Sequence, residues 1–182
     1  MINNFKFDTT EYILYLLQKI EPSQSTKLKL NKIAFFVEFG YLHKIGKELS
    51  KSNYAGIVYG PVINNYKLLL SQMQKKKMIV IDGNYVRPLK GLETKIPDNI
   101  SNIIDPLIEK YSKLTSTELV KLSHLTDSYQ ITTNGEKEMG KIIDKDLAAL
   151  ESFYDDENCD EKIDETKLPR FNAADLIPYA IR

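Results

Sequence analysis

The sequence of 182 residues contains no tryptophan, one cysteine and two histidines. A single cysteine, Cys159, cannot form an internal disulfide, and such cysteine usage is typical of a reducing cytosol. Two histidines and one isolated cysteine do not supply the closely spaced ligands of a protein metal site. The nucleotide-binding motifs G-x-x-x-x-G-K-[ST] and G-x-G-x-x-G are also missing. We therefore expect neither a metal nor any other cofactor.

The sequence also lacks an excess of charge of one sign and any long hydrophobic run. Basic and acidic residues both number 25, so the formal net charge is zero, which argues against a surface built throughout for nucleic acid. No apolar run approaches the roughly 18 residues that a membrane span needs. The first residues lack the basic and then apolar order of a signal peptide. These observations predict a soluble cytoplasmic protein with no membrane partner.

A strongly apolar stretch over residues 28–62 is the most informative part of the chain. Residues 30–45 predict a helix with apolar side chains on nearly every side, which indicates burial on several sides. Gly46 is suited to the left-handed end of that helix. Tyr54–Val58 is predicted to be extended. Tyr59-Gly60-Pro61 is predicted to form a fixed corner, with its proline as the first residue of the next helix.

Shorter signals mark the other elements. Capping boxes at residues 8–11 and 115–118 each predict a helix start, and the first helix should end near Glu21, since Pro22 disfavours helical geometry in the residue before it. Asp82-Gly83 predicts a hairpin turn. The hairpin, over residues 78–88, should pack on the helices, with the Tyr54–Val58 arm as a candidate pairing partner. Further helices are predicted over residues 61–77, 99–113 and 135–154.

The predicted fold class is mainly α (α+β): a compact helical domain around a buried central helix, with a small β-hairpin or short sheet. We expect this domain to cover residues 1–154 and to be followed by a tail of residues 155–182. Residues 155–166 contain seven acidic residues and one lysine, a composition that cannot bury enough apolar surface to order itself. The apolar end of the tail either folds back on the domain or binds another chain.

Few residues suggest chemistry. His124 and Asp127 are a candidate general-base pair, but no motif marks a serine or cysteine nucleophile, so we do not expect an enzyme. Lys32, on the buried helix, is expected to reach the surface along its apolar stem. A basic rim resembles that of a winged helix, but no helix has the clustered Arg, Asn or Gln residues of a recognition helix, so nucleic acid is disfavoured. The rim consists of Lys75, Lys76, Lys77, Arg87 and Lys90.

Three segments resemble the Panacea domain of SocA-like antitoxins. The run from Leu30 to Ile33, continued by Phe36, Tyr41-Leu42 and Gly46-Lys47-Glu48-Leu49, is similar to its K-L-x-K-L-L-Y-F…L…G-K-x-L run. Tyr54-Ala55 and Tyr59-Gly60-Pro61-Val62 resemble its A-x-x-Y-G-P-V segment. Glu118-Leu119 to Leu122-Ser123-His124 resembles its E-L-x-x-L-x-H element. The resemblance spans residues 8–154. It departs from the family where Asp127-Ser128 replaces a proline-tryptophan pair and where a separate DNA-binding domain is missing.

The resemblance implies a mostly helical domain that acts as a cytoplasmic antitoxin, binding and neutralising a cognate protein toxin within a toxin–antitoxin system of bacterial or phage defence. It also implies a protease as a second partner for members that present the toxin for degradation. The alternatives are a proteolytic adaptor or chaperone-like binding module without a dedicated toxin, and a small DNA-binding regulator.

The candidate partner-binding residues lie at the edges of the apolar stretch, in the loop near His124 and in the tail. They are Tyr59, Gly60, Pro61, Val62, His124, Thr126, Phe171, Leu176 and Tyr179. The first four are at least as well explained as a structural corner, because glycine permits the turn. His124 is equally suited to closing hydrogen bonds between helices.

Overall fold

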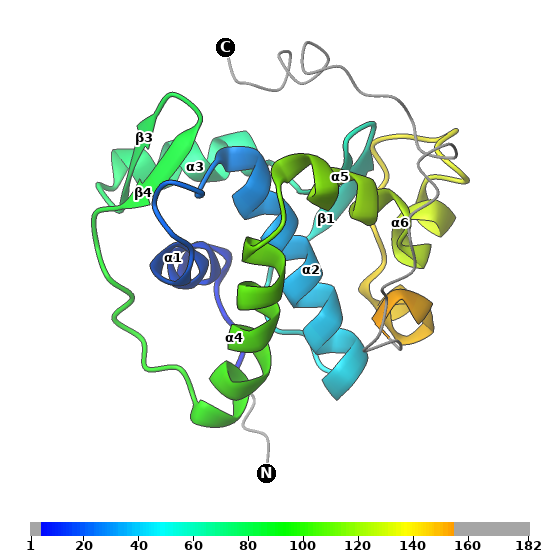
Figure 1. Ribbon diagram of the computed structural model, residues 1–182, viewed down its shortest axis with the longest axis horizontal. Helices are drawn as coiled ribbons and strands as arrows, with labels where there is room; N and C mark the ends of the chain where they lie inside the picture. The colour runs from blue at the N-terminus through cyan, green and yellow to red at the C-terminus, as the bar shows by residue number, and fades with distance from the viewer. Residues whose placement is uncertain (1–4, 155–182) are drawn as a thin grey trace.

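The computed structural model describes residues 5–154. It is mainly α-helical with two small antiparallel sheets, which confirms the predicted fold class. Helices surround one central helix, and one hairpin lies at each of two places on the periphery (Figure 1). The helices are α1 (Thr9–Lys19), α2 (Lys27–Ile45), α3 (Tyr66–Lys75), α4 (Asp98–Ser112), α5 (Ser116–His124) and α6 (Asp127–Thr132), with 3-10 turns η1 (Lys145–Leu150) and η2 (Ser152–Tyr154). The strands are β1 (Tyr54–Ile57), β2 (Gly60–Ile63), β3 (Ile79–Asp82) and β4 (Tyr85–Pro88).

The central helix α2 is buried on all sides, as predicted. Every residue from Lys29 to Tyr41 is buried, and α1, α4, α5, β2 and η1 pack around it. Thr26 caps its N-terminus by accepting from the backbone N–H of Lys29, and Gly46 ends it in the left-handed conformation at φ 69°. The Phe36 ring stacks on Tyr111 of α4 with centroids 4.5 Å apart. Helix α2 is therefore the hydrophobic centre of the fold.

Both predicted capping boxes form. At α1 the Asp8 side chain accepts from the backbone and Glu11 reaches back to the N-cap, and at α5 Thr115 and Glu118 do the same. The helix α1 ends at Lys19, shortly before Pro22. These boundaries need little tertiary help, because the cap residues satisfy the first free N–H groups locally.

We expect Thr115→Ala to lower the free energy of unfolding by about 1 kcal/mol, the typical cost of losing a cap. The variant removes the hydroxyl that accepts from the Glu118 N–H at 3.2 Å. Urea unfolding followed by circular dichroism measures the difference. Thr117→Ala is the matched control, since Thr117 is exposed on the same helix and should change stability by less than about 0.5 kcal/mol. Equal losses in both variants would contradict the role of the cap.

The hairpin β3–β4 confirms the turn predicted at Asp82-Gly83. Asp82 pairs with Tyr85, and Gly83 lies in the two-residue loop with φ 57°. Its inner face buries Ile79 and Val86. The suggested pairing with the Tyr54–Val58 arm is wrong, because β1 pairs with β2 and the two hairpins are separate sheets.

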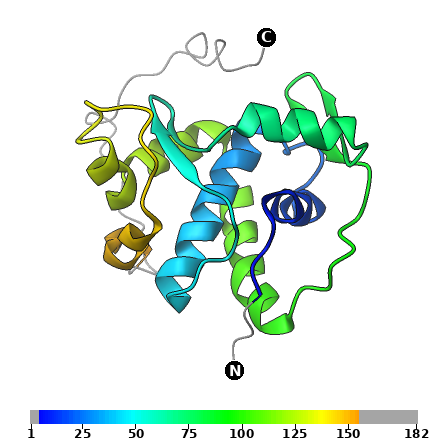
Figure 2. The same cartoon turned by 180° about the vertical axis from the view of Figure 1, so that it is seen from behind.

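The strand β2 replaces the predicted start of a helix at Pro61. After the two-residue loop Val58-Tyr59, Gly60 turns the chain back at φ 82°, and Pro61 pairs with Gly56 across the hairpin. Helix α3 starts at Tyr66, after Asn65 in the left-handed conformation. The prediction failed because proline also suits a strand edge, where its missing N–H is not needed. Figure 2 shows this hairpin crossing in front of α2.

The helix predicted over residues 135–154 is wrong. Asn134, Gly135, Glu136 and Gly140 all have positive φ, which breaks any helix there. The chain then runs beside β1: the Gly140 N–H donates to Gly56 O at 2.7 Å and the Gly56 N–H to Lys141 O at 2.9 Å. A 3-10 turn capped by Asp144 follows. Met139, Ile142 and Leu150 are exposed in this segment. The backbone groups of this segment thus form hydrogen bonds with the edge of β1, and not with one another as they would in a helix.

Candidate functional site

A buried lysine holds the corner between β1 and β2 in place. Lys32 on α2 is 1% exposed, and its Nζ donates to the carbonyl of Tyr59 and, at 2.9 Å, to that of Pro61. The expectation that Lys32 reaches the surface is wrong. The reason is that the corner lies directly over α2 and offers two carbonyls as acceptors. Burial lowers the pKa of Lys32 well below the usual lysine range.

The neighbouring Asn31 fixes the same strand. Its Oδ1 accepts from the Ile63 N–H at 2.8 Å, and its Nδ2 donates to Pro61 O at 3.2 Å. Helix α2 thus supplies hydrogen-bond partners to both ends of β2. The corner is therefore anchored by side chains of the core rather than by its own turn alone.

Gly60 is the point of closest approach in the corner. A Cβ at this position would lie 2.3 Å from Ser123 Oγ, 2.7 Å from Lys32 Nζ and 3.3 Å from His124 Cδ2. These contacts bring α2, β2 and the end of α5 together. We call the group Lys32, Gly60, Ser123, His124 and Glu136 the corner cluster.

His124 joins the corner to the loop after α6. Its Nδ1 lies 2.6 Å from Glu136 Oε1, and its ring packs on Tyr129 with centroids 4.9 Å apart. Burial lowers the pKa of His124, and Glu136 opposes that shift. The proposed pair with Asp127 does not form, because Asp127 Oδ2 instead accepts from the Ser152 N–H and hydroxyl at 3.1 and 3.0 Å.

The hydroxyl of Ser123 is already engaged within α5. It donates to Val120 O at 2.8 Å, and Thr126 Oγ1 donates to Ser123 O at 2.9 Å. Both side chains are buried. The polar groups of the corner cluster therefore bind one another and the backbone, which fixes the junction of α2, β2 and α5.

Exposed apolar side chains surround this fixed corner. Val58 is 49% exposed in the hairpin loop, Leu125 46% after α5, Ile131 56% on α6 and Ile142 50% beside β1. Their segments contact one another: Tyr129 of α6 donates to Ile57 O at 2.8 Å, and Ala55 pairs with Ile142. We call Val58, Leu125, Ile131 and Ile142 the corner rim. Exposed apolar side chains that form one contiguous patch are typical of protein-binding surfaces, whereas single exposed apolar side chains occur on any protein surface.

The candidate partner-binding residues of the corner and the His124 loop are brought together, but most are buried. Tyr59 is 9% exposed, His124 2% and Thr126 0%. Gly60 and Pro61 are buried, and Val62 is half-buried. Phe171, Leu176 and Tyr179 lie outside the described residues.

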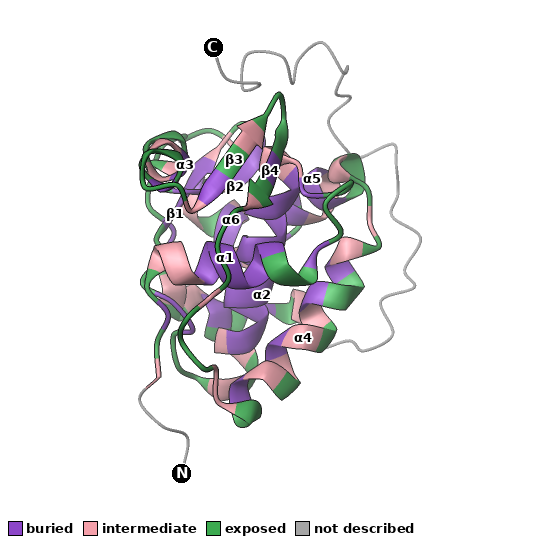
Figure 3. Cartoon of the chain, turned by 90° about the vertical axis from the view of Figure 1, so that its left-hand side faces the viewer, coloured by how far each residue is buried: buried purple, intermediate pink, exposed green. Residues whose placement is uncertain are grey.

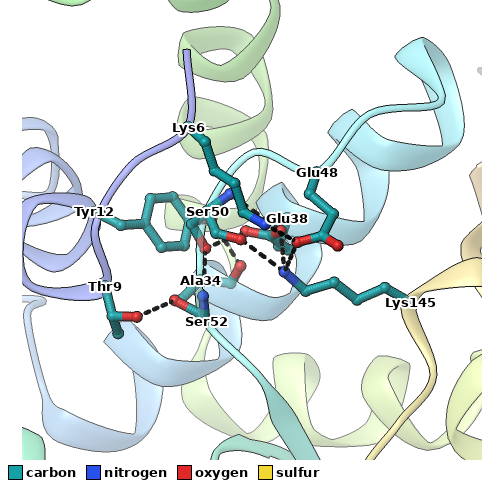
Figure 4. A network of polar contacts seen from close by, with 9 residues as sticks. All are labelled: Lys6, Thr9, Tyr12, Ala34, Glu38, Glu48, Ser50, Ser52 and Lys145. Carbon is teal, nitrogen blue, oxygen red and sulfur yellow. Dashed lines mark hydrogen bonds and ion pairs between the residues drawn. The ribbon is translucent and has the colours of Figure 1, made fainter. Parts of the chain in front are cut away.

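A second buried charge ties α2 to η1. Glu38 is 0% exposed; Lys145 Nζ lies 2.8 Å from its Oε1, and the Ser50 hydroxyl donates to its Oε2 at 2.5 Å. Lys145 also donates to Ser50 O at 2.8 Å and lies 3.3 Å from Glu48 (Figure 4). Burial raises the pKa of Glu38, and Lys145 and Ser50 oppose the shift. This network links the start of η1 to the central helix α2.

Sequence reasoning missed Glu38, Lys145, Glu136 and the helix α6. A signal for the first was present: a carboxylate inside a helix that is apolar on every side must find a buried partner. Its partner is more than one hundred residues away, so no local pattern identifies it. Helix α6 is capped from a distance, because Glu151 accepts from the N–H groups of Asp127 and Ser128 at 2.6 and 3.1 Å.

The buried amine of Lys32 predicts a pH-dependent stability. Folding lowers the pKa of Lys32, so the unfolded chain binds this proton more tightly than the folded chain does. The free energy of unfolding therefore rises with pH between the folded-state pKa and the unfolded value near 10.4. Lys32→Met lacks this titration. We expect the free energy of unfolding of the wild type, minus that of the variant, to rise from about pH 7 to pH 10 in urea titrations.

Lys44→Met is the control for this pH dependence, because Lys44 is exposed on the same helix. The difference in the free energy of unfolding between the wild type and Lys44→Met should change less over the same pH range than the difference for Lys32→Met. Ionisable groups other than the two substituted lysines are common to all the chains, so their contributions cancel in the differences. A flat or falling difference for Lys32→Met would contradict the assignment.

Within residues 5–154 no group of three or more His, Cys, Asp or Glu side chains is arranged to hold a metal ion. None of the helices in that part of the chain is both long and apolar enough to cross a membrane.

Fold and site together define a mainly α-helical domain built on one buried helix that holds a rigid corner. The family model described as Antitoxin SocA-like, Panacea domain, matches residues 30–130, from the start of the central helix to α6. The match covers more than half of the chain, and the chain belongs to this family. No curated protein and no solved structure matches the chain.

Proposed function

We propose that this protein is a cytoplasmic antitoxin that neutralises a cognate protein toxin by binding it directly, without catalysis. Family membership supports an antitoxin role, since the matched segment contains α2, the corner and α5. The observation that carries the proposal is the corner rim, where four large apolar side chains are about half exposed around a fixed corner.

The buried corner residues act in this proposal by positioning the rim. Lys32 donates to the carbonyls on both sides of Gly60 and so holds the end of the loop that presents Val58 against α2. His124 and Glu136 connect the end of α5, next to Leu125, to the loop after α6. A surface that is already ordered loses little conformational entropy on binding, which favours affinity. Tyr59, Gly60, Pro61, Val62, His124 and Thr126 thus contribute as a scaffold, while exposed neighbours contact the toxin.

We expect Ile131→Glu to weaken toxin binding by about 2 kcal/mol, roughly thirty-fold in Kd, as for the loss of an interface hot spot. The charge would be desolvated against an apolar partner, while the exposed position leaves the fold intact. The measurement is growth rescue on co-expression with the toxin encoded beside this gene, followed by titration of the purified pair.

Leu68→Glu is the matched control, because it places the same charge on an apolar side chain outside the rim. Leu68 is 57% exposed on α3. Loss of rescue by Ile131→Glu with rescue retained by Leu68→Glu supports the site. Full rescue by both variants would show that the toxin binds elsewhere. Retention of the protein on DNA in a salt-dependent manner, without any toxin binding, would instead favour a regulator.

A further inference from the structure

A strip of positive charge lies on the unit formed by α3 and the hairpin β3–β4. The lysines at the end of α3 lead into β3, and the N–H groups of Leu89 and Lys90 donate to Met78 O at 2.8 and 3.3 Å. Arg87 pairs with Val80 across the hairpin. Figure 3 shows exposed residues along the hairpin and the adjoining end of α3. We call the exposed side chains of this strip the basic ridge: Lys75, Lys76, Lys77, Arg87 and Lys90.

No side chain of the basic ridge forms an ion pair with a carboxylate within residues 5–154, although Asp82 shares the outer face of the hairpin. The ion pairs of this part of the chain involve other lysines and His124. Residues 64–91 contain six basic and one acidic residue, whereas the rest of residues 1–154 contains 15 basic and 16 acidic residues. The positive excess of the domain is therefore concentrated in this unit.

Exposed apolar side chains lie among these charges. Val80 is 37% exposed, Tyr85 39% and Leu89 59%. Val80 and Tyr85 share the outer face of the hairpin with Arg87, because cross-strand partners and alternate residues point to the same side. An occupant of this surface should therefore carry both negative charge and apolar groups, which describes an acidic peptide better than a bare phosphate chain.

The chain itself contains such a segment. Residues 155–166 carry a formal charge of −6, and apolar residues follow at Leu168, Phe171, Leu176, Ile177, Tyr179 and Ile181. Tyr154 lies beside Gly40 in the second half of α2, and Tyr85 of the hairpin pairs with Thr26 just before the start of α2. At about 1.5 Å per residue of helix these two places are roughly 20 Å apart, a distance that about six extended residues span at roughly 3.3 Å each. The acidic residues from Asp160 onward are therefore within reach of the ridge.

We propose that the tail docks on the basic ridge of the same chain, with the acidic residues from Asp160 to Glu165 against the lysines and Arg87 and the apolar end over Val80, Tyr85 and Leu89. The covalent connection favours docking of the tail of the same chain over docking of the tail of a second copy, because a short linker gives an effective concentration in the millimolar range. The docked tail covers the ridge and keeps it from other acidic partners. This contact is separate from the corner rim and does not depend on the toxin.

The single cysteine permits a direct test on the full chain. Cys159 lies within the acidic run, so a nitroxide spin label attached there reports which backbone amides the tail approaches. In ¹⁵N-labelled protein at low salt we expect strong loss of amide signal over the end of α3 and the hairpin β3–β4, and recovery at high salt, since exposed charges are screened.

Two triple variants test the role of the ridge. Lys76→Glu, Lys77→Glu and Arg87→Glu together should abolish the signal loss. The matched control Lys44→Glu, Lys47→Glu and Lys137→Glu changes the net charge equally at exposed lysines outside the ridge and should preserve it. Signal loss at another surface, none at all, or equal effects of the two triple variants would overturn the proposal.

Other occupants give distinct results. Mixing spin-labelled ¹⁴N chains with ¹⁵N chains that carry Cys159→Ser reveals docking on a second copy, and signal loss at the ridge in that mixture would overturn docking in the same chain. A single-stranded DNA oligonucleotide tests phosphate binding. Neutralising the tail through Asp160→Asn, Glu161→Gln and Asp164→Asn should tighten oligonucleotide binding by uncovering the ridge; equal binding before and after would overturn the proposal.

Discussion

Lys145→Met is expected to lower the free energy of unfolding by about 3 kcal/mol at neutral pH, because removing one member of a buried ion pair leaves an uncompensated charge. Glu38 is fully buried and lies 2.8 Å from Lys145. Ser50 still donates its hydroxyl and N–H to the carboxylate in the variant, but both donors are neutral. Urea unfolding at several pH values measures the loss.

The pH dependence of this loss identifies its cause. Burial raises the pKa of Glu38 and Lys145 lowers it, so the variant raises the folded-state pKa further. The destabilisation is fully present above that raised pKa and fades as pH falls, until it is lost below the unfolded value of about 4.3, where Glu38 is protonated in both states. A loss that stays constant down to that pH would contradict the buried charge as the cause.

Two further variants complete this test. Glu38→Gln added to Lys145→Met should recover part of the lost stability at neutral pH, since it removes the orphaned charge. Lys6→Met is the matched control, because Lys6 pairs with Glu48 in a half-exposed ion pair of the type that contributes between about 0 and 1 kcal/mol.

Gly60→Ala is expected to destabilise the protein by about 3 kcal/mol. Alanine at φ 82° costs roughly 1 to 2 kcal/mol of backbone strain, and its Cβ would lie 2.3 Å from Ser123 Oγ and 2.7 Å from Lys32 Nζ, which adds an overpacking cost of about 1 to 3 kcal/mol. Differential scanning calorimetry or urea unfolding measures the sum.

Gly46→Ala separates the two contributions to this loss. Gly46 has a similar φ of 69°, but nothing lies within 4 Å of its added Cβ, so the control carries the backbone strain alone, about 1 to 2 kcal/mol. The difference between the two variants is the cost of displacing the corner cluster. If the two losses are equal, the corner is not tightly packed and cannot fix the rim.

Features that depend on neighbouring residues were predicted from the sequence. The capping boxes at Asp8 and Thr115, the left-handed end at Gly46 and the turn at Gly83 all rest on contacts within about four residues. The burial of α2 followed from its apolar residues alone. The family was also correctly identified from residues in this stretch.

Features that depend on distant partners were not predicted. The strand at Gly60–Ile63 exists because Asn31 and Lys32 on α2 bind it, and the segment around Ile142 is extended because β1 offers it an edge. Helix α6 needs the carboxylate of Glu151 at its N-terminus. No local sequence pattern marks the rim side chains Val58 and Ile131 as exposed, since their exposure depends on how the corner beneath them packs.

Co-expression of the full chain with each of its gene neighbours tests the central claim most directly. Neutralisation by direct binding predicts that one neighbour arrests growth when expressed alone, that this protein restores growth, and that the two purify as a complex. If no neighbour is toxic alone and rescued by this protein, the antitoxin account is contradicted.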